Sequence, residues 1–157
     1  MKFIKFNFSF KRRSCSFYLT MMAVAFSLLG GLVFFIIDKT VFAGKTNFTD
    51  HTDLTFTFLL LGAVIGFLCM FTELSYLNII SALLTSSGIG MHLYLTMFPL
   101  GDVITKVPFF VSDQLSYTMV ANIFLLFLAI FILADILFVI SCFLFKKSGK
   151  EQIKARC

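Results

Sequence analysis

The sequence predicts an all-α fold, an integral membrane four-helix (tetraspan) bundle, and three observations support this class. Of the 157 residues, 59% are hydrophobic and only 13% are charged, which is not the balance of an ordinary soluble domain. The apolar residues gather into four segments of about 20 residues or more, the length that a helix needs to cross a bilayer. The thirteen Lys and Arg residues all lie outside these segments.

The first apolar segment covers residues 18–37. Ala23, Ser27 and Gly31 recur at intervals of four, so they share one helix face, and small side chains on such a face let a second helix approach closely. A cleavable signal peptide is the alternative, because Ala43 would suit a signal peptidase. The apolar run is longer than that of a usual signal peptide, so we expect a retained membrane anchor.

The second apolar segment, residues 54–72, contains Gly62 and Gly66 in a GxxxG arrangement. This spacing is typical of membrane helices that pack closely, and it says nothing about function. Only Glu73 separates this segment from the third one, residues 74–98. We therefore expect spans two and three to form a tight antiparallel hairpin.

The third apolar segment carries a row of small and polar side chains. They recur at spacings of three and four, which places them on one stripe of a helix. Lipid gives helices no hydrophobic reason to associate, so small and polar faces hold them together, and we expect neighbouring helices to pack against this stripe. The stripe consists of Asn78, Ser81, Thr85, Gly88, His92 and Thr96, with Ala82 and Ser86 on its flank. We expect His92 to be a packing hydrogen-bonder rather than a proton relay.

The fourth apolar segment, residues 117–145, contains Asp135. The helical rise places Asp135 roughly 16 Å from Lys146, near the bilayer midplane. A charge at that depth costs at least roughly 2.5–3.5 kcal/mol, and the four spans contain no Lys or Arg to pair with it. Three alternatives follow: a neutral acid held by hydrogen bonds, a carboxylate in a hydrated path, or a carboxylate paired with a basic residue of another subunit.

The neighbours of Asp135 can be predicted by matching depths along the spans. Counting the same number of residues from the cytoplasmic end brings Ser27, Gly62 and Thr85 level with it. Short side chains at these positions leave room, and hydroxyl groups can donate hydrogen bonds to a carboxyl. We expect Asp135 to face Ser27, Ser81 and Thr85.

Two of the connecting segments carry features of their own. In residues 38–53, Asn47 begins a glycosylation sequon, usable only if this loop faces a lumen in a eukaryote. His51 lies between two acidic residues, but a solvated loop explains this better than a metal site. In residues 99–116, we expect Pro99 to end the third helix. The apolar run that follows would dock at the membrane interface, fold over the end of the bundle, or contact a partner, and we favour the interface.

Basic residues are concentrated at the two ends of the chain. Residues 1–17 and 146–157 each contain five Lys or Arg, whereas the loops after spans one and three share three. The positive-inside rule then places both termini in the cytoplasm, with residues 18–145 as the transmembrane domain. Cys15 and Cys142 lie near span ends, where they are candidates for acylation, although small packed thiols are the simpler explanation.

The sequence narrows the function by exclusion. The net charge of +5 reflects membrane orientation rather than a nucleic-acid surface. We find no set of side chains for catalysis, no cofactor motif and no metal-ligand spacing, so we expect a non-enzymatic protein. The leading hypothesis is an accessory, assembly or organising subunit that binds another membrane protein, or its own copies, through helix–helix contacts. The sequence does not identify the membrane, and we favour the plasma membrane. The alternative is a small oligomeric transporter or channel that uses Asp135 and the polar face of the third span.

Overall fold

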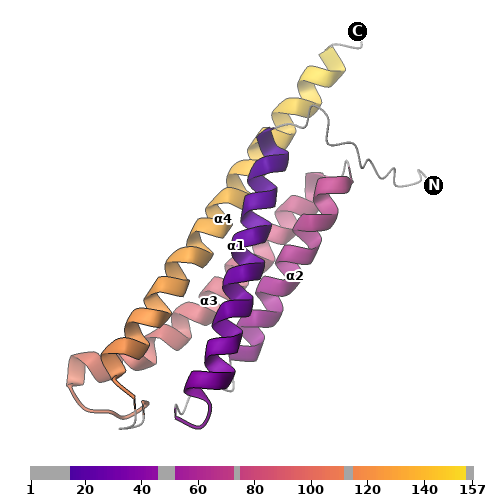
Figure 1. Cartoon of the computed structure of the whole chain (residues 1–157). Helices are drawn as coiled ribbons and strands as arrows, with labels where there is room; N and C mark the ends of the chain where they lie inside the picture. Colours follow the sequence, from indigo (N-terminus) through magenta and orange to yellow (C-terminus); the bar gives the residue numbers. More distant parts are fainter. Residues whose placement is uncertain (1–14, 46–51, 73–74, 112–114, 155–157) are drawn as a thin grey trace.

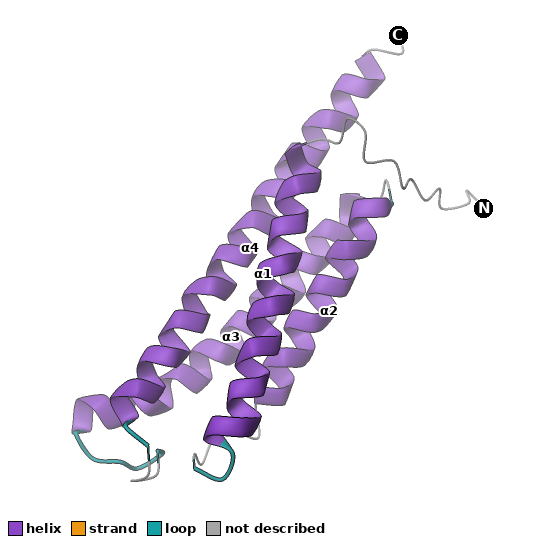
Figure 2. Cartoon of the chain, viewed as in Figure 1, coloured by secondary structure: helices purple, strands orange, loops and turns teal. Residues whose placement is uncertain are grey.

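The computed structural model describes residues 15–45, 52–72, 75–111 and 115–154, and the regular elements within these ranges are all helices (Figure 2). Four of the helices are long and apolar enough to cross a membrane. Their bounds are Cys15–Ile37 for α1, which continues as the π-helical turn η1 at Asp38–Phe42, Thr52–Phe71 for α2, Ser75–Thr105 for α3 and Tyr117–Lys154 for α4.

The four helices form a ring in chain order. α1 packs against α2 and α4, and α3 packs against the same two helices, so α1 and α3 lie diagonally opposite each other. Successive helices run in opposite directions, and α1 begins at the end of the bundle where α4 leaves it (Figure 1). We call this end the termini end. The opposite end, which holds η1 and the connection from α3 to α4, is the loop end.

We expected from the sequence that the third helix ends at Pro99, and this prediction is wrong. The helix continues through Pro99 to Thr105. A proline removes one backbone hydrogen bond, and membrane helices tolerate the loss because neighbouring groups satisfy the freed carbonyl. The helix ends at Thr105, and the next residue, Lys106, takes a left-handed backbone conformation with φ of 59°. This conformation breaks the helical path and turns the chain back toward the bundle.

The fourth helix is longer than its apolar segment. The part suited to a membrane runs from Tyr117 to Leu144, and the helix then continues to Lys154. Figure 1 shows this extension projecting past the other three helices at the termini end. Residues 146–154 of the predicted basic tail are therefore a continuation of α4 rather than a separate segment.

The chain has 23 Phe and no Trp, and the five largest fully buried side chains of the described residues are all Phe. A large aromatic cluster occupies the half of the bundle toward the loop end, and it includes Phe34, Phe42, Phe124, Phe127 and Phe131. A smaller cluster nearer the termini end joins Ala23, Ala82 and Phe138. Large apolar side chains also cover the outside of every helix, which is the surface expected of a protein that is surrounded by lipid.

Candidate functional site

Glycines bring α2 and α3 into close contact. A Cβ atom added at Gly62 would lie 2.7 Å from Thr85 Oγ1, and one added at Gly66 would lie 2.9 Å from Ser81 Oγ. The Ser81 hydroxyl donates a hydrogen bond to the Gly62 carbonyl across this interface. One turn further along, a Cβ at Gly88 would lie 3.1 Å from a side-chain carbon of α2. The GxxxG face of α2 and the polar stripe of α3 therefore pack against each other.

The first helix meets α2 through its own row of small residues. The Ser27 hydroxyl donates to the Leu59 carbonyl at 3.1 Å. Gly31 faces the same residue, since a Cβ added there would make an ordinary contact of 3.7 Å with Leu59 Cβ. Ala23 lies in the smaller apolar cluster against Phe138 of α4. The small residues of α1 are thus used in contacts inside the bundle.

A buried polar network ties three helices together at the termini end. The Ser16 hydroxyl of α1 donates to the Ser141 carbonyl of α4 at 2.9 Å. The Asn78 side-chain amide of α3 donates to Ser141 Oγ, and Thr20 Oγ1 lies 3.1 Å from the same oxygen. Of these four residues, sequence reasoning singled out only Asn78. Ser16 and Thr20 could have been found, because they extend the row of Ala23, Ser27 and Gly31 at spacings of three and four.

His92 lies in an aromatic cage in the half of the bundle toward the loop end. Its ring stacks on Phe124 with 6° between the planes, and it meets Phe34 and Phe131 edge to face. The ring is fully buried, and Nε2 lies 2.9 Å from the Phe124 carbonyl oxygen, to which it donates. Its other nitrogen, Nδ1, has no hydrogen-bond partner within the described residues. His92 therefore joins α3 to α4 through one ring nitrogen, and its other ring nitrogen has no hydrogen bond within the described residues.

Asp135 has a different neighbour from those we expected. Its carboxylate Oδ2 accepts a hydrogen bond of 2.9 Å from Ser86 of α3. The expected partners are used elsewhere, because Ser27 and Ser81 donate to carbonyls of α2 and Thr85 donates to the Ser81 carbonyl. Ser86 is exposed on the outside of the bundle and Asp135 is half-buried, so the pair lies at the outward edge of the α3–α4 contact.

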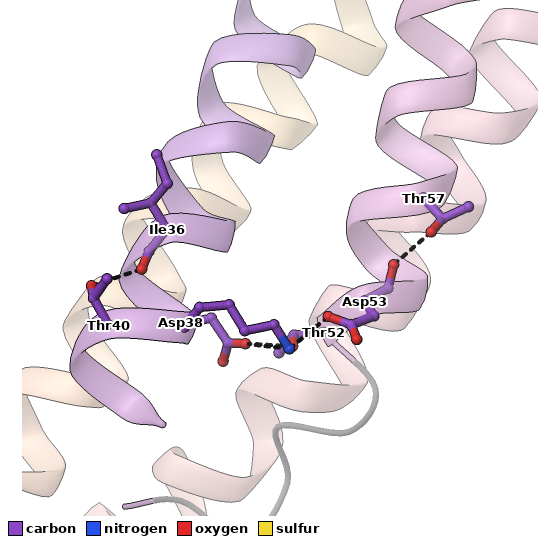
Figure 3. Close-up of polar contacts among 7 residues, drawn as sticks. Ile36, Asp38, Thr40, Thr52, Asp53 and Thr57 are labelled. Atoms are coloured by element: carbon purple, nitrogen blue, oxygen red, sulfur yellow. Dashed lines mark hydrogen bonds and ion pairs between the residues drawn. The ribbon is translucent and has the colours of Figure 1, made fainter. Parts of the chain in front are cut away.

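A second set of charged and polar side chains joins η1 to the start of α2 at the loop end (Figure 3). The buried Asp38 carboxylate accepts a hydrogen bond of 2.7 Å from Thr52 Oγ1. Lys39 Nζ lies 2.8 Å from Asp53 Oδ1 and 3.7 Å from Asp38 Oδ2. These contacts hold the end of the first helix against the beginning of the second. We therefore assign these side chains a structural role.

Asp102 fixes the segment that follows α3. Its carboxylate oxygens accept hydrogen bonds from the backbone N–H groups of Phe109, Phe110 and Val111, at distances from 2.9 to 3.3 Å. Val111 is buried and belongs to the large aromatic cluster, while Phe109 stays 65% exposed. Sequence reasoning did not identify Asp102. An isolated acid shortly before an apolar turn is a signal for such an acceptor.

Several of the predicted features are not brought into a common site. Asn47 and His51 lie outside the described residues. Cys15 is exposed, Cys142 is half-buried, and Cys69 is buried in the interior. Within the described ranges, no three His, Cys, Asp or Glu side chains gather closely enough to hold a metal ion.

No family model, curated protein or solved structure gives a significant match to this chain. The candidate functional site is therefore argued from geometry, and we place it at the outward edge of the α3–α4 contact, where Asp135 and Ser86 share a hydrogen bond.

Proposed function

We propose that this multi-pass membrane protein acts through helix–helix contacts as an accessory, assembly or organising subunit of a larger membrane complex. The observation that carries the proposal is the outward Asp135–Ser86 pair. A carboxyl group at mid-helix is costly beside acyl chains, whereas a neighbouring helix with a hydrogen-bond donor would stabilise it. The edge is therefore better suited to a partner helix than to lipid.

The surface beside the pair suits close approach. Gly90 lies one turn from Ser86 on the exposed face of α3, and a Cβ added there would meet nothing within 4 Å. Two small residues four apart let a second helix come near enough for backbone contacts. Asp135 Oδ1 is itself buried and has no hydrogen-bond partner within the described residues, so Ser86 and Oδ2 are the groups of the pair that a partner helix would contact.

The interior favours this function over a transporter or channel. The polar stripe of α3 is fully buried against neighbouring helices, and most of its side chains already bond to protein groups. A path for ions would need such groups to face water. In a single chain the polar groups of α3 face packed side chains instead. Conduction would therefore require an oligomer whose path is lined by the outer surfaces of the helices.

We also propose that both termini lie in the cytoplasm and that α2 and α3 form a hairpin. Two observations support the orientation: α1 begins at the end of the bundle where α4 leaves it (Figure 1), and the sequence concentrates Lys and Arg before residue 18 and after residue 145. The extensive contact between α2 and α3 supports the hairpin. Glu73 and Leu74 lie outside the described residues.

Photo-crosslinking in native membranes tests the proposal. A photoreactive amino acid replaces Leu83, which is 63% exposed and lies on the Ser86 face of α3. The matched control replaces Leu29, which is 61% exposed on the diagonally opposite helix α1. We expect protein adducts from position 83 and mainly lipid adducts from position 29. Lipid adducts alone from position 83 would contradict a partner at this edge.

A further inference from the structure

Two unpartnered polar atoms lie inside the bundle on neighbouring helices. Thr55 Oγ1 of α2 and His92 Nδ1 of α3 both have no hydrogen-bond partner within the described residues, and both residues are fully buried. Leaving such an atom without a hydrogen bond is unfavourable, because burial has removed its contacts with water. Buried polar atoms in native proteins are nearly always satisfied by protein groups or by an internal water molecule.

The packing of α2 on α3 places these two residues level with each other. Gly66 faces Ser81, Gly62 faces Thr85, and Leu59 faces Gly88. Each step moves about one turn toward the loop end on both antiparallel helices. The next step along the same interface pairs Thr55 with His92.

The first helix supports this alignment independently. Phe34 lies edge to face on the His92 ring at 4.7 Å between centroids. Its neighbour Phe35 stacks on Phe56 of α2, directly after Thr55. One turn nearer the loop end, Asp38 accepts its hydrogen bond from Thr52. The adjacent residues Phe34 and Phe35 of α1 therefore contact His92 and the neighbour of Thr55, respectively. This places Thr55 and His92 in the same layer of the interior.

The chemistry of the two atoms is complementary. Because Nε2 of the neutral His92 ring donates to the Phe124 carbonyl, Nδ1 carries a lone pair and can only accept. Thr55 Oγ1 can both donate and accept. No direct hydrogen bond joins them, so a water molecule can accept from the hydroxyl and donate to the ring nitrogen.

We propose that Thr55 and His92 bind an internal water molecule between α2 and α3, one helical turn inside the Asp38–Thr52 contact. The site is independent of the partner edge at Asp135. It satisfies both orphan atoms and favours the same His92 tautomer as the hydrogen bond to the Phe124 carbonyl.

Solid-state NMR of the full chain in lipid bilayers tests this site. The chain has two histidines, so His51→Gln leaves one ¹⁵N-labelled imidazole, that of His92. We expect the Nδ1 signal to sit at the position of an unprotonated nitrogen that accepts a hydrogen bond. We also expect it to receive polarisation from water protons.

Two variants give the test its contrast. Thr55→Val removes the hydroxyl with little change in shape, and we expect it to shift the Nδ1 signal and abolish the transfer from water. Thr57→Val is the matched control, because Thr57 is exposed and donates to the Asp53 carbonyl of its own helix. We expect Thr57→Val to change neither the Nδ1 signal nor the transfer from water. Thr55→Ser keeps the hydroxyl and should preserve both, which separates loss of the hydroxyl from a general folding defect. Absence of water transfer in the wild-type chain, or an Nδ1 signal unaffected by Thr55→Val, would overturn the proposal.

Discussion

The Ser86 hydroxyl donates to the Asp135 carboxylate at 2.9 Å, on the outside of the bundle rather than in its interior. This placement separates the polar groups of the protein into two classes. The inner groups join the four helices in the interior, whereas the Asp135–Ser86 pair joins α3 to α4 at their outward edge, where we propose that a partner helix binds.

The first prediction concerns Asp135 itself. Asp135→Leu should leave the thermal stability of the isolated protein nearly unchanged, because it removes one hydrogen bond and one unsatisfied buried oxygen together. The same variant should lower the recovery of a crosslinked partner at least about tenfold, which corresponds to about 1.4 kcal/mol. Asp135→Asn keeps an acceptor for Ser86 and should lose less. Full recovery with Asp135→Leu would exclude this residue from the contact.

The second prediction concerns the close approach of α2 and α3. Gly62→Ala should destabilise the bundle by about 1–3 kcal/mol, because the new Cβ would lie 2.7 Å from Thr85 Oγ1 and 3.2 Å from the Ser81 carbonyl oxygen. Gly90→Ala is the control, since its Cβ would meet nothing within 4 Å. It should be neutral or slightly stabilising, because alanine has the higher helix propensity. Denaturant-induced unfolding in detergent micelles measures both, and equal midpoints would refute a tight contact.

The third prediction concerns the polar network at the termini end. Ser141→Ala removes the oxygen that accepts from Asn78 and Thr20, and it should cost about 0.5–2 kcal/mol of stability. Ser87→Ala provides the comparison, because Ser87 is exposed and donates only within its own helix, to the Leu83 carbonyl. Thermal unfolding followed by circular dichroism should separate the two variants. A Ser141→Ala protein as stable as Ser87→Ala would mean that the network contributes nothing.

The fourth prediction concerns Asp102. Asp102→Ala should release the backbone N–H groups of Phe110 and Val111, and their hydrogen exchange should accelerate at least about tenfold, whereas the Phe109 N–H keeps its hydrogen bond to the Val107 carbonyl. Amides in the middle of α3 serve as the internal reference and should exchange at the wild-type rate. Uniform acceleration along the whole chain would instead indicate global destabilisation.

The fifth prediction concerns the exposed apolar residues after α3. Ile104 is 79% exposed and lies seven residues after Met97, on the same face of the helix, so the apolar surface of α3 continues toward Phe109. The chain has no tryptophan, so Phe109→Trp supplies a single fluorescent reporter. Lipids brominated near the headgroup should quench it, and Leu83→Trp should be quenched best by lipids brominated deep in the acyl chains. Quenching of the first reporter only by aqueous iodide would rule out interfacial docking.

Hydropathy was enough to predict four membrane-spanning helices, because length and apolar composition decide that question directly. Gly62, Gly66 and Gly88, which we expected at helix contacts, lie where α2 meets α3, whereas Ser86, expected beside them, is exposed next to Asp135 because it lies at the edge of the stripe. The predicted end of the third helix was wrong. Whether a helix continues through Pro99 depends on neighbouring groups that compensate for the lost hydrogen bond, and the rule that proline ends a helix does not include them.

The partner of Asp135 was missed for a geometric reason. Depth matching uses only the rise along each helix, and the direction of a side chain around the axis was not considered. The buried row of α4 passes through Phe131, Ala134, Phe138 and Ser141, and Asp135 lies one residue away from it. One residue corresponds to about 100° of rotation, which is enough to turn the carboxyl from the centre to the edge.

The length of α4 has a mechanical consequence. Because the helix stays continuous from Leu144 to Lys154, it forms a stiff rod that rises about 15 Å beyond the span. A protein bound to this extension would be displaced when α4 tilts or rotates, because no flexible linker separates the extension from the span. Movement generated within the bilayer could in this way be transmitted directly to the aqueous side.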